Sequence, residues 1–331
     1  MSTLVTGGAG YIGAHVVRLL QERGEQVVVV DDLSTGDASR IGDTPLIVLD
    51  ISKDEAVRVL TETMIDYDVD AVIHFAAQKQ VGVSVKRPAL YFRQNVGGMA
   101  NLMSAMYDAG VRDAVFSSSA AVYGQPDTDV VSEDSPTNPI NPYGQTKLIG
   151  ELLLADCNHA WGLNYIALRY FNAAGAGWVD LADPATLNLI PIVEQALYDG
   201  NVPVVFGDDY PTPDGTCIRD YVHVLDLAKA HLVALDALRE GTVKNRSFNV
   251  GTGSGSSVTE VLETIRNVSG WDFESKVADR REGDPAVLVA DCQALELALG
   301  WKAELGLEDI VESSWNARQA GPKPVKVPAA D

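Results

Sequence analysis

The chain has 331 residues, which is enough for about two domains and a sizeable hydrophobic core without disulfides. Its 46 Asp and Glu residues against 25 Lys and Arg residues give a formal net charge of −21. A surface with this much negative charge repels phosphodiester backbones and anionic lipids. We therefore expect neither nucleic acid nor a membrane as a partner.

The cysteines favour a reducing, cytoplasmic location. Cys157, Cys217 and Cys292 are odd in number and far apart, so the sequence predicts neither a disulfide framework nor a zinc site, and we expect no metal. The N-terminal residues lack the basic region of a signal peptide, and no apolar run approaches the ~20 residues that span a bilayer.

Short apolar runs alternate with amphipathic stretches in the first half of the chain. The apolar runs predict strands at Thr3–Thr6, Gln26–Val30, Leu46–Leu49, Ala71–Phe75, Ala114–Ser117 and Tyr165–Arg169. The amphipathic stretches predict helices at Ala14–Arg23, Asp54–Asp66, Asn95–Ala109 and Tyr143–Trp161. This alternation predicts an α/β fold with a doubly wound parallel sheet of the Rossmann type, which binds ligands at the carboxyl ends of its strands.

The pattern weakens after residue 172, where Gly, Pro and Asp become frequent. Helices are expected at Ile190–Asp199, Val224–Arg239 and Val258–Ser269. We therefore expect a first domain over residues 1–172, to which about 216–252 return, and a smaller α/β lobe over 173–320. Residues 321–331 contain three prolines, and we expect them to form a flexible tail.

A glycine-rich segment lies between the first predicted strand and the first predicted helix. Gly7, Gly10 and Gly13 allow the backbone to turn tightly and to approach a dinucleotide pyrophosphate at the helix N-terminus. Asp31 ends the next strand, 18 residues after Gly13, where such folds place the acid that binds the adenosine ribose hydroxyls. A carboxylate there repels a 2′-phosphate and favours NAD over NADP. Asp32 either shares this role or is a solvated strand end.

Tyr143 and Lys147 are four residues apart, which puts them on one face of a helix. A neighbouring ammonium favours the phenolate, so the pair predicts a tyrosine base with a lowered pKa. Such a pair occurs often by chance, but the glycine loop and Asp31 make it specific. A serine triplet, Ser117 to Ser119, ends a buried strand, and spacing alone does not select among its three hydroxyls.

These motifs resemble the extended short-chain dehydrogenase/reductase family, and most closely its UDP-glucose 4-epimerases. The resemblance covers roughly residues 3 to 318, and several motifs are typical of the sugar-nucleotide members. They read TGGAGYIG, IHFAA followed by Lys79, FSSSAAVYG, NPYGQTK, RYFNAAG, FGDDYPTPDGT, RDYVHV and RREGD. The resemblance implies an NAD-binding first domain and a lobe that mainly binds a UDP-sugar.

The resemblance also implies the roles of individual residues. Tyr143 is the base, Lys147 its electrostatic partner, and Ser119 the hydroxyl that binds the sugar O4. NAD contacts are implied for Gly7, Gly10, Tyr11, Ile12, Gly13, Asp31, Asp32, Asp50, Ile51, Phe75, Ala76, Ala77, Lys79, Asn95, Ser117, Tyr143, Lys147 and Tyr170. UDP-sugar contacts are implied for Lys79, Ser119, Tyr143, Phe171, Asn172, Asn188, Leu189, Phe206, Arg219, Tyr221, Arg281, Asp284 and Leu288.

The implied reaction is reversible epimerisation at C4 of UDP-galactose and UDP-glucose, as used in galactose metabolism. The tyrosinate removes the O4 proton while a hydride passes from C4 to NAD⁺. The 4-keto sugar then rotates, and the hydride returns to the opposite face of C4. Arg219 and Arg281 would hold the diphosphate. Homodimers formed through two helices are common in this family and are expected here at Asn95–Ala109 and Tyr143–Trp161.

Two positions depart from the family pattern. Ala121 replaces a common threonine, so we expect slower turnover. Leu288 replaces a bulkier tyrosine beside the sugar C2 substituent, so we expect N-acetylhexosamines to fit as well.

Two alternative functions are disfavoured by the sequence. Sugar-nucleotide 4,6-dehydratases carry an acid pair where this chain has Ala120 and Ala121, so nothing would protonate a leaving hydroxyl. Non-catalytic dinucleotide sensors lose the tyrosine and lysine, but Tyr143 and Lys147 are both present.

Overall fold

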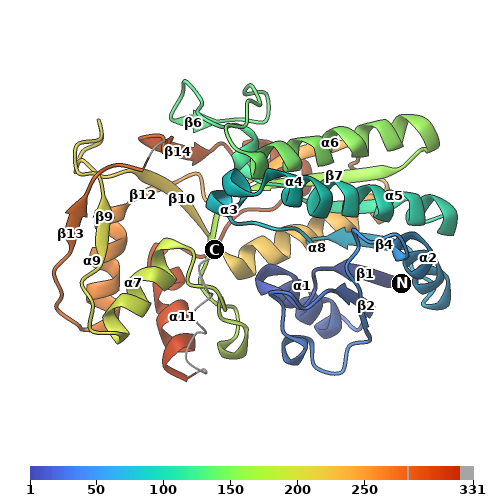
Figure 1. Cartoon of the computed structure of the whole chain (residues 1–331), viewed down its shortest axis with the longest axis horizontal. Helices are drawn as coiled ribbons and strands as arrows, with labels where there is room; N and C mark the ends of the chain where they lie inside the picture. Colours follow the sequence, from blue (N-terminus) through green and yellow to red (C-terminus); the bar gives the residue numbers. More distant parts are fainter. Residues whose placement is uncertain (282, 321–331) are drawn as a thin grey trace.

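The computed structural model describes residues 1–281 and 283–320, which form two lobes (Figure 1). The first lobe is built on a seven-stranded sheet in the order β11-β7-β5-β4-β1-β2-β3, and all of its neighbouring strands are parallel. Its strands are β1 (Ser2–Thr6), β2 (Gln26–Asp31), β3 (Leu46–Val48), β4 (Ala71–His74), β5 (Asp113–Ser117), β7 (Asn164–Tyr170) and β11 (Arg246–Val250).

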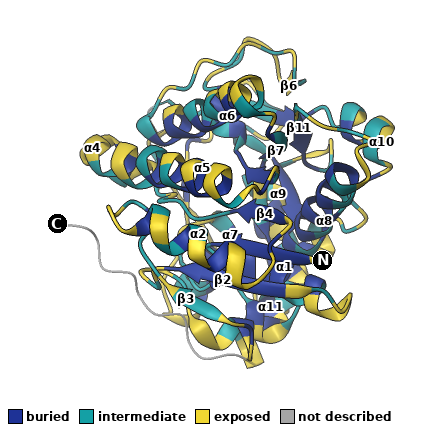
Figure 2. Cartoon of the chain, turned by 90° about the vertical axis from the view of Figure 1, so that its right-hand side faces the viewer, coloured by how far each residue is buried: buried dark blue, intermediate teal, exposed yellow. Residues whose placement is uncertain are grey.

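Helices cover both faces of this sheet, because alternate residues of each central strand point to opposite sides. Val5 packs with one hydrophobic cluster, against α1 (Tyr11–Glu22) and α8 (Val224–Glu240). Its neighbour Leu4 packs with the other cluster, against α2 (Ala56–Asp66), α5 (Gly98–Ala109) and α6 (Pro142–Trp161). Figure 2 shows the buried strands between these helices.

The predicted strands and helices of the first half are confirmed, with ends that differ by a few residues. The helix expected from Asn95 begins earlier, at α4 (Pro88–Tyr91), and continues through a π-helical turn over Phe92–Gly97 into α5. The separate helix α3 (Val81–Lys86) precedes it. Strand β11 was not expected from the sequence, although it pairs with β7 at the edge of the sheet. The predicted α/β fold with a doubly wound parallel sheet is therefore confirmed.

The second lobe contains a smaller sheet in the order β12-β10-β14-β6, with β8 also paired to β10, and a two-stranded sheet of β13 and β9. Its strands are β6 (Val130–Val131), β8 (Asn172–Ala174), β9 (Val204–Phe206), β10 (Ile218–His223), β12 (Gly255–Ser257), β13 (Lys276–Ala278) and β14 (Val287–Ala290). Its helices are α7 (Leu189–Tyr198), α9 (Val258–Ser269) and α11 (Leu307–Ala320). Helix α10 (Gln293–Leu299) packs against the first lobe through Leu295.

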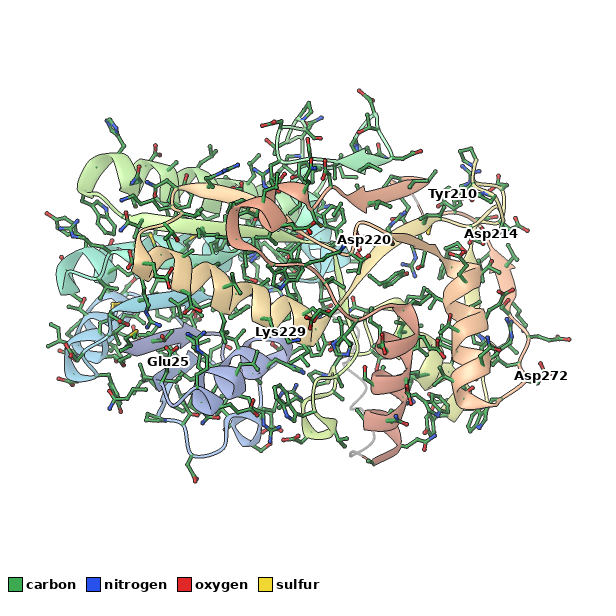
Figure 3. All side chains as sticks on the ribbon, turned by 180° about the vertical axis from the view of Figure 1, so that it is seen from behind. Glu25, Tyr210, Asp214, Asp220, Lys229 and Asp272 are labelled. Atoms are coloured by element: carbon green, nitrogen blue, oxygen red, sulfur yellow. The ribbon has the colours of Figure 1, made fainter. Side chains whose placement is uncertain are left out.

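Asp220 on β10 ties the two sheets together near the middle of the molecule (Figure 3). Its carboxylate accepts hydrogen bonds from the backbone N–H groups of Thr252 and Gly253, which follow β11, and of Ala290 on β14. Burial raises the pKa of Asp220, and these hydrogen bonds oppose that rise. The lobes are thus joined by a buried, fully engaged side chain.

The chain crosses between the lobes more than once. Residues of about 216–252 were expected to return to the first lobe. Within them, β10 lies in the smaller sheet of the second lobe, whereas α8 and β11 belong to the first lobe. The division near residue 172 remains a proposal, and the predicted tail over residues 321–331 lies outside the described residues. Within the described ranges, no helix is both long and apolar enough to cross a membrane.

Candidate active site

A cavity of about 750 Å³ lies at the carboxyl ends of the first sheet's strands. It is lined by the turn between β1 and α1, by the ends of β2, β4 and β7, and by the first turns of α6. The opposite wall comes from residues of the 179–187 segment and from α7 and α11 in the second lobe. This is the edge at which a doubly wound sheet binds a dinucleotide.

The glycine turn between β1 and α1 is too tight for side chains at Gly7 and Gly13. Gly7 has a φ of +71°, and a Cβ on Gly13 would lie 2.3 Å from the Gly7 carbonyl oxygen. Helix α1 begins at Tyr11, directly after Gly10, so its free N–H groups face the cavity. Because the turn carries no side chains at Gly7, Gly10 and Gly13, the N-terminus of α1 stays uncovered. An uncovered helix N-terminus fits a bound pyrophosphate, which is the ligand that the sequence predicts here.

Asp31 is held at the end of β2 by two backbone hydrogen bonds. Its Oδ2 accepts from the N–H of Ala9 at 3.0 Å and its Oδ1 from the N–H of Leu33 at 2.9 Å. Burial raises its pKa, and these hydrogen bonds lower it. Asp32 is exposed and accepts from the N–H and hydroxyl of Ser34. Both side chains line the cavity, with Asp31 in the more rigid position.

Most of the residues expected at the cofactor line this cavity. They are Gly7, Gly10, Tyr11, Ile12, Gly13, Asp31, Asp32, Asp50, Ile51, Phe75, Ala76, Ala77, Lys79, Tyr143, Lys147 and Tyr170. Asn95 and Ser117 are buried behind that wall. Asn95 binds both backbone groups of Gln78 and the hydroxyl of Thr146, so it supports the wall from behind.

Tyr143 and Lys147 lie one turn apart on α6, as their spacing predicts. Their exposed fractions are 7% and 3%. The Nζ of Lys147 donates to the carbonyl oxygen of Ser117 at 2.7 Å and lies 5.9 Å from the centre of the Tyr143 ring. This hydrogen bond fixes the amine at the end of β5, beside the tyrosine.

The expected pKa of Tyr143 needs correction. Burial raises the pKa of Tyr143 well above its usual value, with a further rise from Tyr170 and an opposing effect of the Ser119 side chain. Burial also lowers the pKa of Lys147 to about 7, and the charge of Glu151 opposes this. In the protein alone, desolvation therefore outweighs the ammonium, whose own charge is weakened by the same burial.

The structure separates the three serines that spacing left equivalent. Ser117 contributes its carbonyl oxygen to Lys147, and Ser118 donates its hydroxyl to Glu151 at 2.5 Å. Ser119 caps the short 3-10 helix over Ala120–Val122, and its side chain lies near enough to Tyr143 to lower the pKa of that residue. Ser119 is thus the serine beside the tyrosine.

The residues expected at the UDP-sugar gather mainly on the second lobe. Leu288 on β14 lies opposite Arg219 on β10, and Asn172 on β8 lies opposite Tyr221. The Nη2 of Arg219 lies 3.4 Å from Oδ1 of Asp284. The guanidinium of Arg281 lies over the Phe206 ring, 4.2 Å from its centre.

The other three residues of this set pack around the same lobe. Phe171 belongs to a buried cluster against which Leu288 packs. Asn188 precedes α7 and donates its side-chain N–H to Asp183, and Leu189 begins that helix. Apart from Lys79 and Tyr143, the expected sugar residues are not among the described residues that line the 750 Å³ cavity. Their contact with a UDP-sugar stays a prediction.

Several cavity residues were missed by the sequence analysis. Arg40, Glu194 and Arg318 line the cavity but come from segments without a recognisable motif. Burial raises the pKa of Glu194 to about 7, with Ser314 and Arg318 opposing the rise. Arg40 comes from the segment between β2 and β3, whereas Glu194 on α7 and Arg318 on α11 reach the cavity only because the second lobe packs against the first. Glu151 also went unnoticed, although it lies four residues after Lys147 on the same helix.

Comparisons with known proteins agree with this geometry. Residues 3–251 match the NAD dependent epimerase/dehydratase family. The chain is 46% identical over 327 residues to a UDP-glucose 4-epimerase of Halalkalibacterium halodurans, and the match covers 97% of each chain. It is also similar to two crystal structures of UDP-glucose 4-epimerases.

The first is the enzyme of Brucella ovis in complex with NAD, with a TM-score of 0.90, 44% identity and coverage of 95% of this chain and 97% of that one. The second is the enzyme of Stenotrophomonas maltophila with bound NAD and formylated UDP-arabinopyranose, with a TM-score of 0.90, 42% identity and coverage of 97% and 98%. The chain therefore belongs to the NAD dependent epimerase/dehydratase family.

Proposed function

We propose that this protein is a UDP-glucose 4-epimerase, an isomerase of galactose metabolism that interconverts UDP-galactose and UDP-glucose with bound NAD. The observation that carries the proposal is the grouping of Tyr143, Lys147 and Ser119 at the edge of a dinucleotide cavity. Relatives from Halalkalibacterium halodurans, Azospirillum brasilense and Corynebacterium glutamicum that share nearly the whole chain are UDP-glucose 4-epimerases, which supports the same reaction.

The cavity residues fit NAD. The turn at Gly7 and Gly13 and the N-terminus of α1 would bind the pyrophosphate, and Asp31 would bind the adenosine ribose. Lys147 would hold the nicotinamide ribose. When bound, NAD⁺ supplies a reversible hydride acceptor for the sugar C4 and a positive charge beside Tyr143. That charge would oppose the desolvation that raises the pKa of Tyr143.

The protein's own groups move the O4 proton. Ser119 would hold the sugar O4 by a hydrogen bond while Tyr143, as phenolate, takes the proton from O4. Lys147 stabilises that phenolate through its charge, because its Nζ is fixed beside the ring by the Ser117 carbonyl. The 4-keto sugar must then present its other face, after which Tyr143 returns the proton to O4 and the configuration at C4 is inverted.

The second lobe would hold the nucleotide end of the substrate. Arg219 and Arg281 offer guanidinium groups to the diphosphate, and Arg281 is already oriented by the Phe206 ring. Firm binding of the UDP part leaves the hexose free to turn. Leu288 is shorter than tyrosine and lies opposite Arg219, so we propose that UDP-N-acetylhexosamines are also accepted.

Dehydration remains disfavoured at this site. Ala120 and Ala121 follow Ser119 in the short 3-10 helix, and neither carries an acidic group for a leaving hydroxyl.

We also infer a homodimer in a reducing, cytoplasmic compartment. Tyr107 on α5 and Leu152 on α6 are 60% and 57% exposed, on the two helices expected at the interface. The three cysteines are free, as expected where thiols stay reduced. Sedimentation velocity should give twice the monomer mass, and L152E should reduce it to that of one chain.

The direct test uses purified protein without added cofactor. It is given UDP-galactose, UDP-N-acetylgalactosamine and UDP-xylose in turn, and the products are followed by NMR. We expect UDP-glucose from the first substrate and the 4-epimer from the second. If no 4-epimer forms from any of them, even after NAD is added, the proposed function is wrong.

A further inference from the structure

Glu151 lies on the same face of α6 as the two proposed catalytic residues. Tyr143, Lys147 and Glu151 follow one another at intervals of four residues, so they occupy successive turns. The exposed fraction of Glu151 is 7%. It is therefore a buried carboxyl one turn beyond the active-site lysine, without a role in the proposed reaction so far.

The carboxylate of Glu151 binds the strand end that carries the catalytic serine. Its Oε1 accepts from the hydroxyl of Ser118 at 2.5 Å. Ser118 is flanked by Ser117, whose carbonyl oxygen binds Lys147, and by Ser119, whose side chain lies beside Tyr143. One carboxylate thus anchors the middle of a three-residue segment whose two ends both meet the catalytic pair.

Further partners hold this carboxylate in place. Arg169 on β7 donates its Nε to Oε1 at 3.0 Å and its Nη2 to Oε2 at 2.7 Å, and Ser247 on β11 donates its hydroxyl to Oε2 at 3.1 Å. A buried ion pair with this many hydrogen bonds holds both groups in one geometry. The anchor is therefore rigid, because it is shared by strands β7 and β11 of the large sheet.

The charge of Glu151 also acts on Lys147. Burial lowers the pKa of Lys147 to about 7, and Glu151 is the group that opposes this. The Nζ of Lys147 donates to the neutral carbonyl of Ser117. The nearby His74 and His231 are buried with pKa values lowered to about 3 and about 4, so both rings are neutral at pH 7. Without the carboxylate, the pKa of Lys147 would fall further, so less of the amine would be charged at neutral pH and the phenolate of Tyr143 would have weaker electrostatic support.

We propose that Glu151 is a positioning residue of the epimerase site, which orients Ser119 through Ser118 and maintains Lys147 as an ammonium beside Tyr143. The inference rests on the proposed function. Glu151 itself does not touch the reacting atoms, since it acts only through Ser118 and Lys147.

Three variants separate these effects. E151Q removes the charge but keeps the shape, S118A removes only the link to the strand end, and S247A is the matched control. S247A deletes a hydrogen bond to the same carboxylate, but on β11 and away from the serine triplet. Each is purified with its bound cofactor, and kcat and KM for UDP-galactose are measured from pH 5.5 to 9.5, together with the thermal unfolding temperature.

We expect E151Q to lower kcat by about tenfold or more, the effect of one general acid–base partner being about 10²–10⁴. KM should change by less than about threefold, since the UDP site is untouched. The alkaline limb of kcat should move to lower pH, because Lys147 loses its proton more readily. S118A should lower kcat without moving that limb. S247A keeps both the Arg169 ion pair and the Ser118 link, so it should lower kcat much less than S118A and should not move the limb.

A double variant controls for misfolding. Loss of the carboxylate alone leaves Arg169 buried and unpaired, which can destabilise the fold. E151Q/R169Q removes both charges and should shift the alkaline limb in the same direction but less far, because loss of the Arg169 cation partly offsets loss of the carboxylate. An unchanged pH profile and rate in S118A and in either folded Glu151 variant would overturn the inference. Failure of the wild-type protein to epimerise UDP-galactose would instead reject the proposed function.

Discussion

Asp284 lies 3.4 Å from Arg219, and this ion pair leaves the guanidinium with an unused donor. The Nη2 of Arg219 is buried and, among the described residues, has this ion pair but no hydrogen bond, whereas Nη1 donates to the carbonyl oxygen of Ile218. A buried donor without an acceptor is costly, so an arriving phosphate oxygen would gain a strong partner. The second lobe thus holds a guanidinium ready for an anion.

Arg219→Ala should weaken binding of the nucleotide more than it slows the reaction. A hydrogen bond to a charged group is worth about 1.5–3 kcal/mol, which corresponds to a KM for UDP-galactose raised about 10- to 150-fold. Titration calorimetry with UDP alone should show the same loss. Arg280→Ala is the control, because Arg280 pairs with Asp209 and stacks on Tyr210, which is labelled in Figure 3. Equal losses in both variants would contradict the role of Arg219.

Tyr143→Phe should lose activity but keep the cofactor. Removal of a general base lowers kcat by about 10²- to 10⁴-fold, whereas the cavity walls that would hold NAD remain. The bound NAD is measured by its absorbance after acid release, and the rate by conversion of UDP-galactose. Tyr67→Phe, on a tyrosine that ends α2 at the surface, should behave as wild type. A Tyr143→Phe protein with full activity would exclude this tyrosine as the base.

Leu288→Tyr should narrow the range of sugars. The added ring and hydroxyl would fill space next to Arg219 and the cluster that contains Phe171. We expect turnover of UDP-N-acetylgalactosamine to fall about tenfold or more relative to UDP-galactose, since steric exclusion of a larger group is worth about 1–3 kcal/mol. Leu288→Val keeps the space open and should preserve the ratio. The ratio of kcat/KM for the two substrates is the measurement.

Asp31→Asn should weaken the preference for NAD over NADP. The substitution removes the negative charge that would repel a 2′-phosphate. It also leaves a single acceptor oxygen, so that the backbone N–H groups of Ala9 and Leu33, which bind different oxygens of Asp31, cannot both be satisfied as they are now. We expect NAD affinity to fall by about tenfold, the value of one or two lost hydrogen bonds, while NADP loses less. Fluorescence titration measures both. Asp43→Asn, on an exposed side chain, serves as the control and should leave both affinities intact.

Stability should decline as the pH falls from about 6.5 to 4, partly because of His15. Burial lowers the pKa of His15 to about 4, and its neutral ring donates Nδ1–H to Tyr11 and accepts from the N–H of Gly177. A histidine in the unfolded chain has a pKa near 6.5, so as the pH falls the unfolded chain binds a proton before the folded protein does. This proton binding stabilises the unfolded chain relative to the folded protein. His15 thus supports the fold fully above about pH 6.5 and loses that contribution as the pH falls towards 4.

Urea unfolding at several pH values checks this dependence. His15→Gln should flatten the fall of the unfolding free energy between pH 6.5 and 4 by about 1–3 kcal/mol, the equivalent of one to two pKa units. His159→Gln changes an exposed residue of α6 and should leave the slope unaltered. Identical slopes in all three proteins would show that His15 does not carry this dependence.

The sequence alone predicted those parts of the site that are formed by residues close together in the chain. The turn around Gly7 and Gly13, the acid at the end of β2 and the one-turn spacing of Tyr143 and Lys147 are set by short-range sterics and by helix periodicity. The order of strands and helices also follows from alternating apolar runs, because each run must bury its side chains on both faces of one sheet. Strand β11 was missed because Arg246, Ser247 and Asn249 interrupt its apolar pattern.

Tertiary structure decided what depends on groups far apart in the chain. It selected Ser119 over its neighbours, brought Arg40 and Glu194 to one cavity, and placed Glu151 between Ser118 and Arg169. It also reversed the expected pKa shift of Tyr143, since the cost of burying a charge depends on the whole surroundings and not on one neighbouring ammonium. Likewise, the net charge of −21 says little about the ligand, whereas the placement of a few cations such as Lys147 and Arg219 determines where an anion can bind.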